Sequence, residues 1–173
     1  MSDRILRLPR LLEADPRGSQ LLLNLRSLGR PLWKGSELDI PWTGLNRELA
    51  GALKQASGAG QVVRGLEKAE QILAAEERGL RLVDNQTGVT RGIRISRLLL
   101  VSSDGAERFY RRVEALLRRH GPRVMVVGLE TDAKGLGGIL FGSGGFARLI
   151  MLKHKEAVAS VLLAMAGECN SRS

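Results

Sequence analysis

Apolar residues recur along most of this chain with two alternating spacings. In some segments they fall three or four positions apart, which places them on one face of a helix. In others they form short uninterrupted runs, which are typical of strands buried on both faces. The helical spacing predicts helices over residues 45–56, 66–79, 106–120 and 155–167, and the runs predict strands over 61–65, 97–103, 123–128 and 145–152.

This alternation of strands and helices predicts the fold class. Strands separated by helices of about 10–15 residues favour an α/β protein with a largely parallel sheet. We therefore expect a three-layer α/β/α sandwich, with a mainly parallel or mixed central sheet, over residues 44–167. Residues 168–173 are expected to form a short polar tail.

Residues 1–43 differ in composition from the rest of the chain. They hold four of the five prolines and both tryptophans, Trp33 and Trp42. Only residues 20–29 offer a short continuous element. We therefore expect an irregular, basic N-terminal extension that packs partly on the domain or becomes ordered on binding.

Polar and glycine residues predict where individual elements begin and end. Gly79 is expected to end the helix that precedes it. Residues 81–95 hold the sequence DNQTG between short β-branched runs, which predicts a hairpin or an elaborated loop. An oxygen of Ser103 or Asp104 is expected to cap the arginine-rich helix that follows, because it can accept a hydrogen bond from a free N–H of the first turn.

The segment GGILFGSGGFARLIML, residues 137–152, is a candidate phosphate-binding loop. A Walker-type loop needs Gly-Lys-Ser/Thr between a strand and a helix, but here Lys134 precedes the glycines. The GxGxxG dinucleotide pattern is also missing, since Phe146 and Ala147 follow the glycines. What comes next is strand-like, without the helix N-terminus that supports a bound phosphate. We interpret the glycines as a structural turn into the last strand.

The helix over residues 106–120 concentrates basic side chains on one face. At about 100° per residue its apolar positions face the sheet and its arginines share the opposite arc. Arginine suits bidentate contacts with phosphate, so this face predicts an interface with a nucleic-acid backbone. A solvated helix face is the alternative interpretation. The predicted nucleic-acid-binding residues are Arg108, Arg111, Arg112, Arg118 and Arg119, together with Arg64 and Lys68 beside the glycine-led helix.

The overall charge favours an anionic partner. The net charge is +9 and the sequence pI is about 10.7. This balance favours nucleic acid or a ribonucleoprotein, although an arginine-rich proteome would give the same charge without such a partner. The lone cysteine, Cys169, excludes an intramolecular disulfide and cysteine metal sites, which fits a reducing compartment. No apolar run approaches the ~20 residues of a membrane span and no signal-peptide core is found, so we expect a cytoplasmic protein without a membrane partner.

Candidate catalytic residues are few. His120 and His154 lie at expected helix ends without a paired nucleophile, and no cluster has the spacing of a zinc site. Asp104, Glu130 and Asp132 follow strands, where a shared cleft would let them act as acid–base groups or Mg²⁺ ligands. Helix capping and loop solvation explain the same acids. We therefore assign no catalytic residue, no metal site and no cofactor.

Several short motifs occur in order along the chain, namely Gly65-Leu66 before a helix, Ser103-Asp104 and Glu130-Thr131 after strands, and residues 144–147 before the last strand. In this order they resemble the C-terminal domain of eukaryotic and archaeal peptide-release factors and their Pelota relatives. The resemblance spans residues 45–165 and implies the α/β/α sandwich of the kink-turn-binding ribosomal-protein superfamily. It implies an RNA- or ribosome-associated module or a docking domain, without peptide release, because the Gly-Gly-Gln motif is absent.

Together these features predict an RNA- or ribosome-associated binding module without catalytic activity. Its expected partner is structured RNA or a ribonucleoprotein. One alternative is a protein–protein adaptor that docks through residues 1–43. A further alternative is a small Mg²⁺-dependent enzyme that uses Asp104, Glu130 and Asp132.

Overall fold

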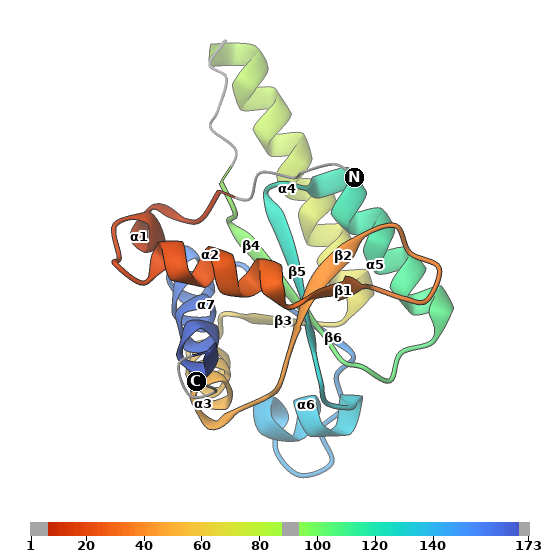
Figure 1. The fold of residues 1–173 in the computed structure, drawn as a ribbon. Helices are drawn as coiled ribbons and strands as arrows, with labels where there is room; N and C mark the ends of the chain where they lie inside the picture. Colours follow the sequence, from red (N-terminus) through yellow and green to blue (C-terminus); the bar gives the residue numbers. More distant parts are fainter. Residues whose placement is uncertain (1–6, 88–93, 170–173) are drawn as a thin grey trace.

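In the computed structural model, which describes residues 7–87 and 94–169, helices cover both faces of a central sheet (Figure 1). The helices are α1 (Arg10–Glu13), α2 (Gly18–Ser27), α3 (Arg47–Gly58), α4 (Leu66–Thr87), α5 (Glu107–His120), α6 (Ala133–Phe141) and α7 (Lys155–Cys169). The strands are β1 (Gly29–Pro31), β2 (Asp39–Thr43), β3 (Val62–Arg64), β4 (Arg97–Val101), β5 (Val124–Leu129) and β6 (Leu149–Leu152). None of the helices in these described ranges is long and apolar enough to cross a membrane.

The sheet is mixed, as the alternation of elements predicts. Its strand order is β1-β2-β5-β4-β6-β3. The three neighbours β2, β5 and β4 run parallel, whereas β1, β6 and β3 each pair antiparallel with their neighbour. The central strand β4 is held on both sides, with Leu99 opposite Val126 of β5 and Met151 of β6.

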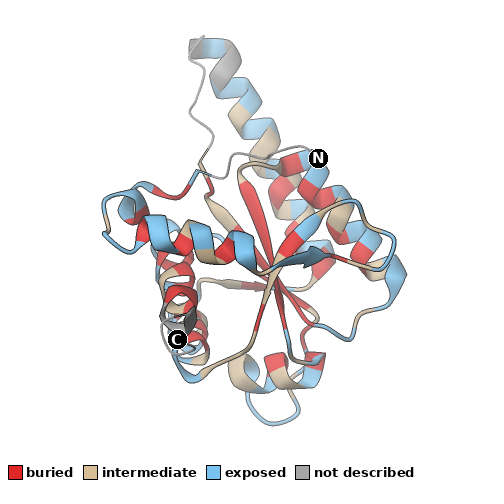
Figure 2. Ribbon diagram, viewed as in Figure 1, coloured by how far each residue is buried: buried red, intermediate tan, exposed pale blue. Residues whose placement is uncertain are grey.

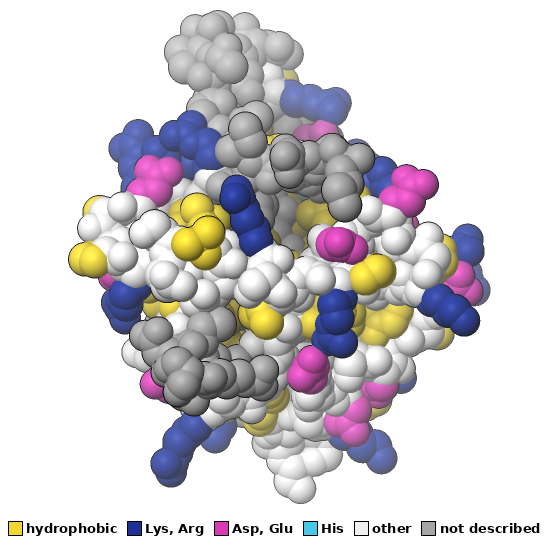
Figure 3. All heavy atoms as spheres, in the orientation of Figure 1, with side chains coloured by type: hydrophobic (Ala, Val, Ile, Leu, Met, Phe, Trp, Pro, Cys, Tyr) yellow, Lys and Arg dark blue, Asp and Glu magenta, His cyan; other side chains and the backbone are white. Residues whose placement is uncertain are grey.

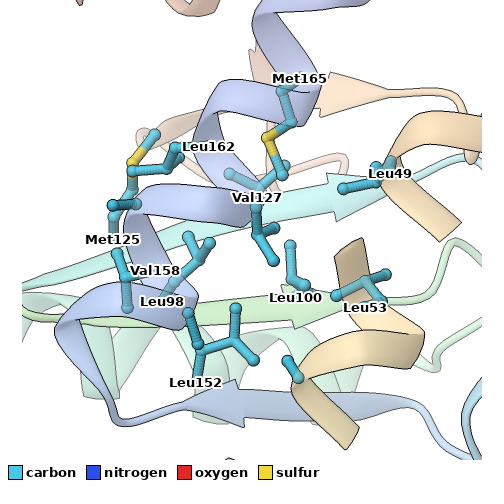
Figure 4. Close-up of a cluster of buried hydrophobic side chains, with 14 of the residues drawn as sticks. Leu49, Leu53, Leu98, Leu100, Met125, Val127, Leu152, Val158, Leu162 and Met165 are labelled. Atoms are coloured by element: carbon cyan, nitrogen blue, oxygen red, sulfur yellow. The ribbon is translucent and has the colours of Figure 1, made fainter. Parts of the chain in front are cut away.

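Alternating side chains of the central strands fill two separate cores, which makes the fold a three-layer α/β/α sandwich (Figure 2). Leu98 and Leu100 of β4 belong to the core beneath α2, α3 and α7, part of which Figure 4 shows. Leu99 and Val101 belong to the core beneath α4 and α5. The predicted fold class is therefore confirmed. The carboxyl ends of β4 and β5 meet at one edge of the sheet, beside α6.

The expectation of an irregular N-terminal extension is wrong for its described part, which forms α1, α2, β1 and β2. The two prolines of the strands do not interrupt their pairing. Trp42 N–H donates to Leu28 O, and Leu32 N–H donates to Leu38 O. Backbone hydrogen bonds between β1 and β2 alternate along the register, and Pro31 and Pro41 fall at the positions in between, where no N–H has to donate to the partner strand.

The region before β4 and the start of α5 also differ from the sequence prediction. Gly79 does not end α4, which continues to Thr87, so residues 81–87 are helical rather than part of a hairpin. Residues 88–93, and most of the expected tail over 168–173, lie outside the described residues. Neither Ser103 nor Asp104 caps α5, because Ala106 stands at its N-cap without a side-chain bond.

Candidate nucleic-acid interface

Helix α5 separates its apolar and basic side chains as its sequence predicts. Tyr110, Val113, Leu116 and Leu117 are buried in the core beneath α4 and α5. The five predicted contact residues of this helix are all exposed, namely Arg108, Arg111, Arg112, Arg118 and Arg119. They lie along the outer surface of the helix, where a polyanion has access to them.

Glutamates neutralise much of this arginine row. The pairs are Arg111–Glu107 (3.0 Å), Arg112–Glu70, Arg118–Glu114 (3.4 Å) and Arg119–Glu77 (3.2 Å). Arg108 has no acidic partner in the described parts of the chain. Exposed ion pairs of this kind contribute only about 0–1 kcal/mol, so a phosphate can compete with the glutamates for the same guanidinium groups.

Part of the row also anchors the loop between β1 and β2. Trp33 Nε1 and Ser36 Oγ both donate to the carboxylate of Glu114, at 3.3 and 2.8 Å. Burial raises the pKa of Glu114. The two hydrogen bonds and the charge of Arg118 outweigh this effect, so the pKa lies below its ordinary value. The guanidinium carbon of Arg111 lies 4.7 Å from the centroid of the Trp33 ring. These residues therefore have a structural role in addition to any contact with a ligand.

The other two predicted contact residues, Arg64 and Lys68, lie where β3 ends and α4 begins. Gly65 joins the two elements with a φ of 96°, a conformation that favours glycine. Arg64 donates a side-chain hydrogen bond to the carbonyl oxygen of Phe146. Its guanidinium carbon lies 4.6 Å from the ring centroid of Phe141. The structure thus places Arg64 against the segment between α6 and β6.

A second arginine lies over a second phenylalanine at the same place. The guanidinium carbon of Arg148 is 5.1 Å from the ring centroid of Phe146, and its Nη1 is 3.4 Å from the Asp104 carboxylate. Phe141 and Phe146 are 37% and 43% exposed, which is high for phenylalanine. We call Arg64, Lys68, Phe141, Phe146 and Arg148 the arginine–phenylalanine surface.

The glycines of residues 137–152 shape this surface. A Cβ on Gly137 would lie 2.2 Å from the backbone nitrogen of Phe146, and one on Gly145 would lie 2.3 Å from the Gly137 oxygen. Gly142 and Gly144 take positive φ values of 82° and 81°. The loop therefore folds back tightly on α6, and β6 follows it. The interpretation of the glycines as a structural turn agrees with this geometry.

The three candidate acids are engaged by neighbouring groups. Asp104 accepts hydrogen bonds from Ser102 Oγ (2.8 Å) and from Ala133 N–H (3.1 Å). Burial raises the pKa of Asp104, but these bonds and the charge of Arg148 outweigh that effect and lower it. Asp132 caps α6, and Glu130 pairs with Arg30 at 2.7 Å. Within the described residues no group of three or more His, Cys, Asp or Glu side chains could hold a metal ion.

The two histidines lie on separate elements. His120 is buried at the end of α5, with its Nδ1 3.8 Å from the Glu77 carboxylate. Burial lowers the pKa of His120, and the positive charges of Arg119 and Arg123 lower it as well. The negative charge of Glu77 has the opposite effect but does not outweigh them. His154 is exposed just before α7. Neither is placed for acid–base work in the described structure.

The sequence prediction omits three members of the arginine–phenylalanine surface, which are Phe141, Phe146 and Arg148. Their signal is present in the sequence but weak. Arg148 is a charged residue directly before the apolar run of β6, and each phenylalanine adjoins a glycine of the turn. That this segment meets Arg64 depends on a hydrogen bond to the carbonyl oxygen of Phe146, 82 positions away, which no local pattern reveals.

No family model and no curated protein matches this chain. Among solved structures, a protein of unknown function from Bacillus halodurans is similar, with 20% identity over 67% of this chain and 98% of that one, at a TM-score of 0.41. A Giardia lamblia 15.5kD RNA binding protein is similar with 17% identity over 72% of this chain and 86% of that one, at a TM-score of 0.44. Similarity at these TM-scores does not indicate a function. The function is therefore inferred from the surface of the chain itself.

Proposed function

We propose that this chain is an RNA-binding module without catalytic activity, acting on structured RNA or a ribonucleoprotein such as the ribosome. The observation that carries the proposal is the arginine–phenylalanine surface, where Arg64 and Arg148 lie over two exposed rings, Phe141 and Phe146. Aromatic and guanidinium planes on which unpaired bases stack are the usual means of recognising single-stranded parts of RNA.

The magnitudes favour exchange of these arginines for bases. An arginine over an exposed aromatic ring contributes about 0.5–1 kcal/mol. Stacking of a base on an aromatic side chain contributes about 1–3 kcal/mol per base. A base can therefore take the place of the guanidinium on Phe141 or Phe146, and the displaced arginine can pair with the adjacent phosphate.

The neighbouring helices extend the basic surface. Lys68 lies on the first turn of α4, and α5 packs beside α4 with its arginine row exposed. In this proposal the predicted α5 residues supply phosphate contacts flanking the stacked bases. Because phosphate contacts release counterions, the logarithm of the association constant should fall linearly with the logarithm of the salt concentration.

Fluorescence-anisotropy titration of structured, single-stranded and duplex probes at two salt concentrations tests the proposal. We expect one structured RNA with unpaired bases to bind most tightly, and Phe141→Ala/Phe146→Ala to weaken it about tenfold or more, as loss of a stacked base implies. Leu11→Ala/Leu23→Ala is the matched control, because these exposed leucines lie on α1 and α2. Indiscriminate binding to every polyanion, or equal weakening by both variants, would contradict the proposal.

The adaptor alternative is favoured by one observation, the exposure of Leu11 (61%) and Leu23 (60%) on the N-terminal extension. The two leucines lie on helices α1 and α2, which contact each other, and exposed apolar side chains on adjoining elements favour a protein docking surface. In this case Leu11→Glu/Leu23→Glu should abolish affinity capture of a protein partner, while leaving RNA binding unchanged. Capture that survives this variant would rule out docking through these leucines.

A further inference from the structure

The loop between β1 and β2 and the start of α5 border an open hollow outside the arginine–phenylalanine surface. It has a volume of about 520 Å³ and is lined by Trp33, Lys34, Gly35, Glu107 and Tyr110. Figure 1 shows the loop reaching over α5. Sites for small ligands commonly span about 300–1,000 Å³, so the hollow is large enough for one nucleotide.

The aromatic wall of this hollow is fixed in place by its neighbours. Trp33 is held by the Glu114 carboxylate, and a Cβ on Gly35 would lie 2.4 Å from its Cζ3, so the loop backbone packs against the indole. Tyr110 donates its hydroxyl hydrogen to Ser102 O at 2.7 Å and accepts from Gly105 N–H at 3.0 Å. Neither ring has to become ordered when a ligand enters, which lowers the entropic cost of binding.

The rim of the hollow carries one charge of each sign. Lys34 is exposed and makes no ion pair with any described residue. Glu107 pairs with Arg111 through one carboxylate oxygen, at 3.0 Å. A carboxylate has about four acceptor positions, so Glu107 keeps the capacity to accept from a ligand. The hollow thus offers an anion partner, the partly exposed Trp33 ring and a hydrogen-bond acceptor.

We propose that this hollow binds one guanine nucleotide unit of the RNA, which rests on the proposed RNA-binding function. The base lies against the Trp33 ring in place of the Arg111 guanidinium, which is 4.7 Å from the ring centroid, and its phosphate pairs with Lys34. Glu107 accepts from the base, and guanine suits it best because its N1–H and exocyclic amino group present two adjacent donors to one carboxylate. An adenine or uracil edge lacks this pair of donors.

The position of the hollow fits a strand that continues from the arginine–phenylalanine surface. Arg148 of that surface donates to Asp104 O at 2.9 Å, and Tyr110 of the hollow donates to Ser102 O. The same short loop, residues 102–106, therefore touches both sites. RNA stacked at Phe146 needs to cross only this loop to bring a neighbouring nucleotide into the hollow.

The chain's two tryptophans provide the test. In a Trp42→Phe protein the tryptophan fluorescence comes from Trp33 alone. If Trp42→Phe does not fold, the Trp33 fluorescence is obtained as the difference between the wild-type and Trp33→Phe proteins. The probes are GMP, AMP, inorganic phosphate and a short oligouridylate with or without one central guanosine. We expect saturable quenching by GMP and by the guanosine-containing strand, with a preference of about fivefold or more over AMP and all-uridine RNA.

Two variants assign the contacts. Glu107→Gln should remove the preference for guanine, and Lys34→Glu should weaken GMP and the guanosine-containing strand alike. Equal quenching by phosphate and GMP, or no quenching while RNA still binds in anisotropy, would overturn the hollow as a nucleotide site but leave the proposed function standing. GMP quenching without any binding of RNA would overturn both the proposed function and the assignment of the hollow to RNA.

Discussion

Two adjacent glycines of α6 have opposite surroundings. A Cβ on Gly137 would lie 2.2 Å from the backbone nitrogen of Phe146, whereas a Cβ on Gly138 would meet nothing within 4 Å. Only the first glycine is therefore required for the loop that presents Phe146. The same substitution at the two glycines therefore tests whether the close contact at Gly137 holds the loop that carries Phe146.

We expect Gly137→Ala to lower the free energy of unfolding by about 1–3 kcal/mol, because the methyl group meets backbone that cannot move aside easily. It should also weaken RNA binding, since the Phe146 backbone must shift. Gly138→Ala should be neutral or stabilise by about 0.5–1 kcal/mol, because alanine favours an exposed helix. Urea unfolding and anisotropy measure both effects, and equal behaviour of the two variants would contradict this description of the loop.

His120 makes stability depend on pH. Burial, with the charges of Arg119 and Arg123, lowers its pKa in the folded protein against the opposing effect of Glu77. The unfolded state then binds more protons than the folded state below its ordinary pKa of about 6.5, so stability falls as the pH falls through that value. We expect the urea midpoint to drop between about pH 7 and 5, and His120→Gln to flatten this dependence. A midpoint equally pH-dependent in both proteins would show that His120 is not responsible.

At the scale of elements, the N-terminal extension is part of the sheet. Trp42 of β2 pairs with Gly128 of β5, and a Cβ on that glycine would lie 2.2 Å from the indole. Ile40, two residues earlier, is only 2% exposed and belongs to the core beneath α4 and α5. Removing residues 1–43 would therefore uncover an edge of β5 as well as remove an appendage.

We expect Ile40→Ala to destabilise the whole chain by about 2–4 kcal/mol in one cooperative transition, because it leaves a cavity in a shared core. Asp39→Ala on the same strand is the control, since Asp39 is exposed and should have little effect. An unfolding transition of the main domain that Ile40→Ala leaves unchanged would indicate that the extension folds separately.

The elements that could be predicted from sequence are those whose signal is local. Helix α5 and strand β5 follow from contiguous amphipathic or apolar patterns. The continuation of α4 past Gly79 does not, because a single glycine costs a helix only about 1 kcal/mol, which other contacts can offset. The exposure of the α5 arginines was also predictable, but their partners Glu70 and Glu77 lie 42 residues away from the arginines they bind.

At the scale of the whole molecule, many basic side chains lie beside acidic ones, as the ion pairs of α5 illustrate. On the face that carries α1, α2 and β1, basic and acidic side chains are interspersed (Figure 3). The net charge of +9 therefore describes general attraction to polyanions but does not locate a binding site. Guanidinium groups also lie over the rings of Trp33 and Trp42, but those rings are only half-exposed. The arginine–phenylalanine surface differs because two such pairs adjoin there and both phenylalanines are exposed.

The most direct test of this account compares two charge reversals of equal size. Arg64→Glu alters the arginine–phenylalanine surface beside the edge strand β3, whereas Arg26→Glu alters an exposed position of α2, which contacts β2 near the other end of the strand order. Measured by anisotropy with the tightest RNA of the panel at one moderate salt concentration, Arg64→Glu should raise the dissociation constant about tenfold or more, and Arg26→Glu only slightly. Equal weakening by the two variants would mean that binding follows overall charge, and would contradict an interface at the arginine–phenylalanine surface.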